Sequence, residues 1–224
     1  MSTATDGRRC TQIRLFVFVF ICVYLRPSAA ETLDRIAVSI GSAVITESDV
    51  FREIRVAAFL DHKTPDFSPE SKRKAADRLV DQYFILQEAS VSHLTLPTAE
   101  VVQSLLDHTK EEYGADYGPA LKRCFLTEQD LVDQLLQGLR TIRFTEMRFR
   151  PEVLLSTDEL TDYYTNTLVA KWKRENLSPI PSFEESRATV ERLLTDERMM
   201  QSLDRWLGAS RTERRILYRE DVFK

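Results

Sequence analysis

The chain has 224 residues, of which 43% are hydrophobic and 29% are charged, a balance typical of a globular protein with a substantial core. Only 6 glycines and 8 prolines are present, which argues against a glycine-rich nucleotide-binding fold and against a β-sandwich with many tight turns. The net charge of −4 argues against a dedicated nucleic-acid-binding protein, because such proteins carry an excess of basic residues.

The first 30 residues have the pattern of a secretory signal peptide. Three arginines precede the apolar run at residues 15–25, and the small residues Ser28, Ala29 and Ala30 follow it. As a helix this run would extend roughly 16 Å, which is too short for a bilayer core of about 30 Å. We therefore expect export, with cleavage after Ala30. The alternative is an uncleaved anchor that holds the same domain at the inner membrane.

Cleavage would also change the charge and the cysteine content. It removes four arginines and one aspartate from 31 basic and 35 acidic residues, which leaves 27 and 34 and a net charge of −7. Of the three cysteines only Cys124 remains, so no intramolecular disulfide can form. Because an exposed lone thiol is a liability in an oxidising compartment, we expect Cys124 to be a small buried apolar residue.

The mature chain begins and ends with β-strand patterns. Ile36, Val38 and Ile40 alternate with small residues, Gly41 and Ser42 form a turn, and the apolar character then resumes, which predicts a short hairpin. The other good strand candidate is the segment at residues 215–218. An isolated hairpin is marginally stable in water, so we predict that the two ends of the chain pair in one small sheet.

Between the two ends the sequence predicts a succession of helices, which makes the fold class mainly α with a small sheet. The expected helices cover residues 46–60, 69–91, 98–113, 127–149, 156–175 and 182–207, with a short helical turn at 118–124. Their starts are marked by Ser or Thr followed three residues later by an acidic residue: Thr46 and Asp49, Thr127 and Asp130, Ser156 and Glu159, Ser182 and Glu185.

Two further features of these helices carry predictions. Gly208 is the expected C-cap of the last long helix. The helix at 69–91 has a broad apolar face, which predicts a central position in the fold. That face consists of two adjacent stripes of apolar residues. One stripe contains Leu79, Tyr83 and Leu86, and the other contains Val80, Phe84 and Ile85.

The sequence contains none of the common motifs for nucleophilic, metal or phosphate chemistry. The three histidines are scattered along the chain, and we expect them at the surface. The sequence therefore predicts no enzymatic activity, no cofactor and no metal site.

Two stretches combine basic and aromatic residues. Arginines between positions 140 and 150 alternate with Phe144, Met147 and Phe149, and basic residues flank Trp172. Such a stretch is either a surface that binds apolar or acidic peptides, or a set of arginine stems that pack over core aromatics. Trp172 is correspondingly either part of a binding patch or a partly buried anchor.

Three segments resemble the SurA-type periplasmic chaperones, in the same order as in that family. Residues 31–54 resemble its first strand pair and helix, residues 74–101 its second helix and the following turn, and residues 183–211 its C-terminal helix. The matching residues are Asp34, Ile36, Val38, Val44, Ile45, Ser48, Asp49, Leu79, Val80, Ile85, Leu86, Ala89, Phe183, Glu184, Glu185, Leu203, Trp206 and Leu207.

The resemblance implies a chaperone core without the parvulin-type prolyl isomerase domain that many relatives insert. It divides the chain into a signal peptide (1–30) and a core (31–224), with an N-terminal part (31–165), a linker (166–181) and a C-terminal helix and strand (182–224). The linker is too short to hold an isomerase domain.

The function that the resemblance implies is that of a periplasmic, ATP-independent holdase. Its partners would be unfolded exported polypeptides, with outer-membrane proteins as candidate clients. It would not bind nucleic acid and, with the signal peptide cleaved, would not insert stably into the membrane. The expected client-binding residues flank the site of the missing domain: Met147, Phe149, Tyr164 and Trp172. The alternatives are a peptidyl-prolyl isomerase and a non-catalytic subunit with one dedicated partner.

Overall fold

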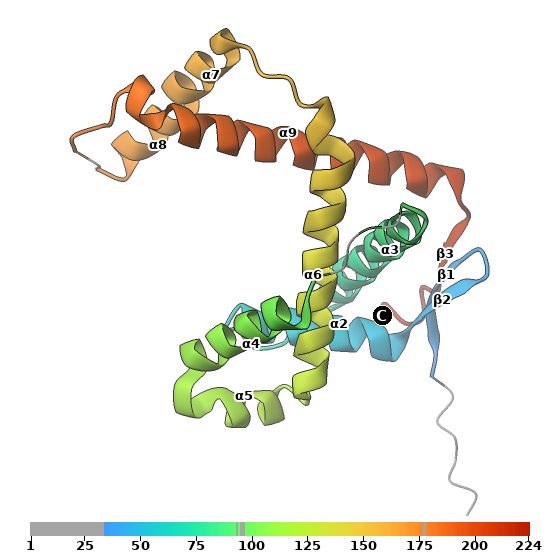
Figure 1. Cartoon of the computed structure of the whole chain (residues 1–224). Coiled ribbons are helices and arrows are strands. Elements are labelled where there is room, and N and C mark those ends of the chain that lie inside the picture. The colour runs from blue at the N-terminus through green and yellow to red at the C-terminus, as the bar shows by residue number, and fades with distance from the viewer. Residues whose placement is uncertain (1–33, 93, 95–96, 177) are drawn as a thin grey trace, which may run out of the picture. The chain divides into compact units, whose positions relative to one another are not determined.

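The computed structural model of the chain describes residues 34–92, 94, 97–176 and 178–224, and residues 35–224 form one compact unit (Figure 1). The expected signal peptide lies outside the described residues. The helices are α2 (Glu47–Leu60), α3 (Pro69–Val91), α4 (Ala99–Tyr113), α5 (Tyr117–Arg123), α6 (Glu128–Phe149), α7 (Thr157–Tyr163), α8 (Val169–Arg174) and α9 (Phe183–Glu213), with 3-10 turns at Gly114–Asp116 and Arg150–Glu152 and a π-helical segment at Tyr164–Leu168. Within this described part, no helix combines the length and the apolar character needed to cross a membrane.

The two ends of the chain pair in one antiparallel sheet, which confirms the predicted fold class. The strands are β1 (Ile36–Ile40), β2 (Ala43–Thr46) and β3 (Ile216–Tyr218), and β1 lies in the centre. The hairpin turn places Gly41 at a φ of +58°, a conformation that favours glycine. The expected partner strand is β3, and the backbone NH of Arg219 extends its pairing by donating to the carbonyl of Ala37 over 2.9 Å.

Three separate clusters of buried side chains hold the helices together. The sheet cluster joins the sheet, α2, α3, α6, α9 and the C-terminal tail, the α5 cluster joins α2, α4, α5 and α6, and the α7 cluster joins α7, the π-helical segment and α9. Helix α6 contributes to the first two and α9 to the first and third, and the two helices contact each other, as Figure 1 shows. These two long helices therefore connect apolar clusters that are separate from one another.

The four predicted capping boxes are all present. At the start of α9, for example, the hydroxyl of Ser182 donates to the carboxylate of Glu185 over 2.7 Å, and the backbone NH of Glu185 donates back to that hydroxyl over 3.4 Å. The caps of α2, α6 and α7 follow the same scheme. The helix starts were therefore predictable because each cap satisfies exposed backbone groups with residues a few positions apart.

The cap of α9 gives a testable pH dependence. The hydrogen bonds from the side chain and the backbone of Ser182 lower the pKa of Glu185 below its ordinary value of 4.5. A lowered folded-state pKa stabilises the protein above pH 4.5, and this contribution is lost as the pH falls through the folded-state pKa. We expect Ser182→Ala to destabilise the protein more at pH 7 than at pH 3, measured by urea unfolding. Ser104→Ala, at an exposed site on α4, is the control and should show a pH-independent difference.

Two predicted helices differ from the structure, one in where it ends and one in an interruption along its length. The last helix continues past Gly208 to Glu213, so the prediction of a C-cap at Gly208 was wrong. Its final turn is held because the guanidinium of Arg211 donates to the carboxylate of Asp81 (2.8 Å) and to the backbone carbonyl of Asp77 (3.0 Å) on α3. The helix expected at 156–175 is interrupted by the π-helical segment, in which the hydroxyl of Thr165 donates to a backbone carbonyl one turn earlier. Helical structure nevertheless continues to residue 174, close to the expected end at residue 175, and includes residues 166–174 of the expected linker.

Candidate functional site

The structure does not bring the four expected client-binding residues together on one exposed surface. Met147 lies on α6 and is 41% exposed. Phe149 is only 4% exposed, because its ring packs against Phe144 and Trp206 in the sheet cluster. Its assignment to a client-binding surface is therefore corrected: Phe149 is a core residue.

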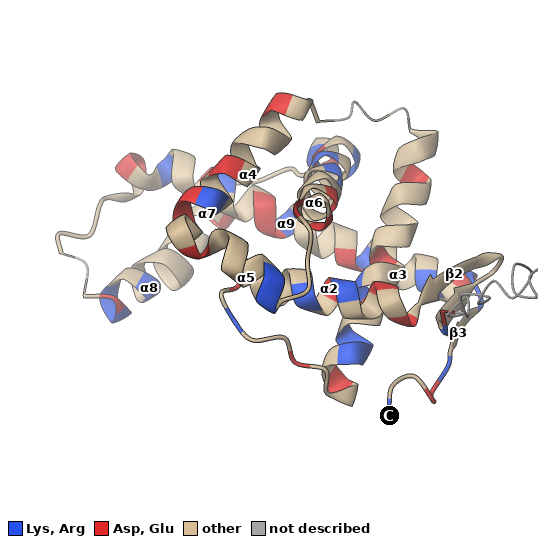
Figure 2. Ribbon diagram, turned by 90° about the horizontal axis from the view of Figure 1, so that it is seen from below, with Lys and Arg blue, Asp and Glu red and all other residues tan. Residues whose placement is uncertain are grey.

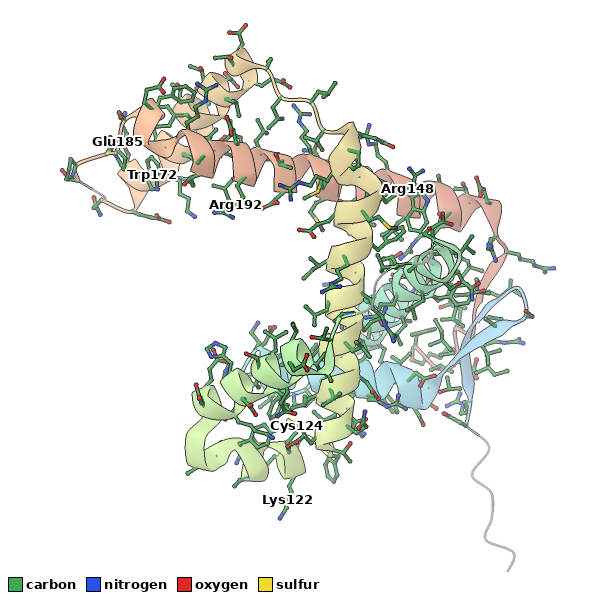
Figure 3. All side chains as sticks on the ribbon, in the orientation of Figure 1. Lys122, Cys124, Arg148, Trp172, Glu185 and Arg192 are labelled. Carbon is green, nitrogen blue, oxygen red and sulfur yellow. The ribbon has the colours of Figure 1, made fainter. Side chains whose placement is uncertain are left out.

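Tyr164 and Trp172 pack against each other in the α7 cluster. Their ring centroids are 6.3 Å apart, and Tyr164 also makes an edge contact of 5.6 Å with Phe183 at the start of α9. The hydroxyl of Tyr164 donates to the backbone carbonyl of Pro181 over 2.7 Å. Figure 3 shows Trp172 on α8, beside the N-terminal part of α9. Trp172 is half-buried, in accord with the interpretation of a partly buried anchor.

The arginines near the end of α6 do not form one free basic patch. Arg148 pairs with Glu152 at 3.3 Å, and its guanidinium carbon lies 5.7 Å from the ring centre of the buried Phe149. Arg150 lies 4.0 Å from the carboxylate of Glu146. Both charges thus have a neighbouring carboxylate, and Arg148 lies beside a core aromatic.

Cys124 and the described histidines lie beside side chains that belong to the fold's packing or to its surface ion pairs. Cys124 is buried in the α5 cluster, as predicted, and Figure 3 shows it within that part of the fold while Lys122 points away. His62 and His108 are exposed; His62 stacks on Tyr113 and His108 lies 3.5 Å from Glu112. His93 lies outside the described residues. No group of three or more potential metal ligands occurs in the described part of the chain.

A groove of about 280 Å³ lies where α2, α3 and α6 come together. Its floor is apolar: Ile45 and Val56 are buried, and Leu79 and Tyr83 are half-buried. Leu86 forms part of its wall and is 37% exposed. These apolar side chains thus contact the core on one side and line the groove on the other.

One charged residue of the groove is neutralised within the fold. The side chain of Glu53 on α2 is almost fully buried and accepts a hydrogen bond of 2.7 Å from Nε of Arg78 on α3. A buried carboxylate is costly unless it is paired and hydrogen-bonded. This ion pair therefore joins α2 to α3 and adds no free charge to the groove.

The remaining charges give the groove an acidic rim. Arg52 lies 3.4 Å from Asp49 and 3.6 Å from Asp130, so one cation serves two carboxylates. Burial raises the pKa of Asp130, but hydrogen bonds from Thr127 and the charge of Arg52 outweigh it and hold this pKa below 3.8. Asp133 accepts a 2.8 Å hydrogen bond from Gln129 and forms no ion pair with any residue that the structure describes. Figure 2 looks along α6 and shows acidic residues on it close to the mixed charges of α2.

Two buried donors on α6 have no acceptor. They are Nε2 of Gln137, a residue that lines the groove, and Nε of Arg140, one turn further along, and neither has a hydrogen-bond partner among the described residues. A buried donor without an acceptor costs about 1–3 kcal/mol. Both atoms are covered by the protein, so they add nothing to the surface that the groove presents to a bound molecule.

Local sequence patterns did not predict this groove. The one signal that pointed to it was the breadth of the apolar face of α3, where the stripe with Leu79, Tyr83 and Leu86 lies beside the stripe that forms the core. The contributions of Asp133 and Gln137 carried no local signal, because polar residues on α6 gain a role only when α2 and α3 pack beside them.

No known protein family has a model that matches this sequence, and no curated protein matches it. The chemistry available at the groove therefore follows from the residues alone. They provide an apolar floor and an excess of carboxylates at the rim, which suit a ligand that has an apolar part beside a positive charge.

Proposed function

We propose that this protein is an exported, ATP-independent chaperone of the SurA type, reduced to the core without an isomerase domain. The observation that carries the proposal is the closure of one small sheet by both ends of the chain around a helical body. This is the arrangement that the resemblance of residues 31–54 and 183–211 implies. The proposed location is the periplasm, and the proposed partners are unfolded exported polypeptides, outer-membrane proteins among them.

The distribution of apolar side chains supports a holdase. Val101 and Leu105 on α4 and Ile142 and Met147 on α6 are exposed outside the three clusters, in addition to the groove. Apolar surface rimmed by charged residues is what a protein needs to hold unfolded chains and still remain soluble. Binding of this kind requires neither ATP nor a cofactor, because it uses the free energy of apolar burial.

Two alternatives make different predictions. A prolyl isomerase would accelerate cis–trans exchange of a proline peptide in a protease-coupled assay, whereas the proposed holdase would not. A subunit with one dedicated partner would copurify with a single protein in a fixed ratio, whereas a chaperone would bind a mixture of clients.

The direct test is an aggregation assay. The chain is expressed with its leader and purified, and its intact mass reports whether residues 1–30 have been removed. A denatured outer-membrane β-barrel protein is then diluted out of urea with and without this protein, and light scattering is followed without ATP. We expect suppression of scattering at a near-stoichiometric ratio. Unchanged scattering would contradict the proposal and favour the dedicated-partner alternative.

A further inference from the structure

We propose that the groove between α2, α3 and α6 binds extended polypeptide segments in which a bulky apolar residue is flanked by lysine or arginine. This inference rests on the proposed function, because it takes the occupant to be an unfolded client. It goes further by naming one site on the molecule and one class of client segment.

The size and lining of the groove favour side chains of an extended segment. A volume of about 280 Å³ lies at the lower end of the range for ligand sites, so it accommodates one or two bulky side chains and no folded element. The floor of Ile45, Val56, Leu79 and Tyr83 would bury such side chains away from water. Burying one large apolar side chain contributes about 1.5–3 kcal/mol before the costs of binding.

The charge of the rim selects the flanking residues. Because Glu53 is neutralised by Arg78, the free charges are those of Asp49, Asp130 and Asp133 against the single cation Arg52. A segment with lysine or arginine beside its apolar residue would complete this arrangement, whereas one with aspartate or glutamate would add like charges. Charge complementarity at a rim acts mainly on selectivity and association rate.

The test uses two fluorescein-labelled peptides with the same apolar centre, Phe-Leu-Phe, flanked by lysines in one and by glutamates in the other. Binding to the purified full chain is followed by fluorescence anisotropy at low and at high salt. We expect the lysine peptide to bind about fivefold more tightly or better, with a preference that shrinks at high salt because the rim charges are screened.

Two variants with matched controls locate the site. Asp133→Arg reverses the charge of the rim and should abolish the preference for the lysine peptide. Its control is Asp107→Arg on α4, since Asp107 is also exposed and also accepts a 2.8 Å hydrogen bond from the glutamine four residues before it. Leu86→Gln removes apolar surface without adding charge and should weaken the binding of both peptides, and Leu105→Gln is its control because both leucines are 37% exposed.

The outcomes separate this inference from the proposed function. Equal affinities for the two peptides, or equal losses in the test and control variants, would overturn the groove inference. If the wild type suppresses aggregation and Asp133→Arg and Leu86→Gln suppress it equally well, the chaperone function stands and the groove is not its client site. If the variants lose peptide binding but the wild type does not suppress aggregation, the groove binds peptides and the chaperone proposal fails. Thermal unfolding verifies that each variant is folded, and Asp133→Arg at an exposed site retains the test if Leu86→Gln does not fold.

Discussion

Replacing Phe144 by alanine is expected to lower the free energy of unfolding by about 4 kcal/mol. Phe144 lies on α6 with none of its surface exposed, and its ring contacts Phe149 and Trp206 at centroid distances of 6.0 and 5.2 Å. Its removal leaves a cavity where α6 meets α9, and dense packing allows little relaxation around it. Urea unfolding followed by circular dichroism measures the loss.

The matched control for this substitution is Ile142→Ala. Ile142 is on the same helix and 57% exposed, so its loss should change stability by less than about 1 kcal/mol. Similar effects of the two substitutions would mean that α6 does not pack against α9 through Phe144. That result would contradict the role of the sheet cluster in holding the two long helices together.

Ending the chain after Arg219 is expected to cost about 4 kcal/mol, close to the effect of losing Phe144. The deletion removes Val222 and Phe223, which are buried in the sheet cluster. It also removes the backbone carbonyls of Val222 and Lys224, each of which accepts a 3.2 Å hydrogen bond from the side chain of Lys72 on α3. The midpoint of urea unfolding and the loss of β-sheet pairing, seen by amide hydrogen exchange in β1, measure the effect.

The control for the truncation keeps the full length of the chain and neutralises two exposed acidic residues of the C-terminal tail. Glu220→Gln and Asp221→Asn eliminate ion pairs with Arg73 and Arg35, which lie at exposed positions and should contribute little to stability. If the truncated chain does not fold, the double substitution Val222→Ala with Phe223→Ala tests the same burial in a full-length chain. A truncated chain as stable as the wild type would show that the C-terminal tail does not belong to the core.

The candidate site was less predictable than the fold, as Phe149 and Trp172 illustrate. Both were selected because they flank the site where relatives carry an inserted domain, and both lie in stretches that combine aromatic and basic residues, a pattern that also arises where arginine stems cover buried rings. Sequence order cannot tell which face of α6 meets α9, and this contact decides that Phe149 is buried while Met147, two residues earlier, is exposed. The groove escaped prediction for the same reason, since it joins residues of α2, α3 and α6 that are far apart along the chain.

The sequence by itself determined the features that depend on residues a few positions apart. Capping boxes such as the one formed by Ser182 and Glu185 set the starts of the helices, Gly41 set the turn of the hairpin, and apolar periodicity set the core faces. The pairing of the two chain ends was also predictable, because a lone hairpin lacks stability and one further strand was available.

Only the tertiary structure decided where helices continue and which surfaces remain open. Helix α9 passes Gly208 because Arg211 is held by Asp81 across the packing with α3, an interaction between residues 130 positions apart. The acidic rim likewise exists because Arg52 is shared between α2 and α6 while Asp133 forms no ion pair within the described part of the chain. Such balances of burial and charge depend on which helices meet, and they therefore appear only once the chain is folded.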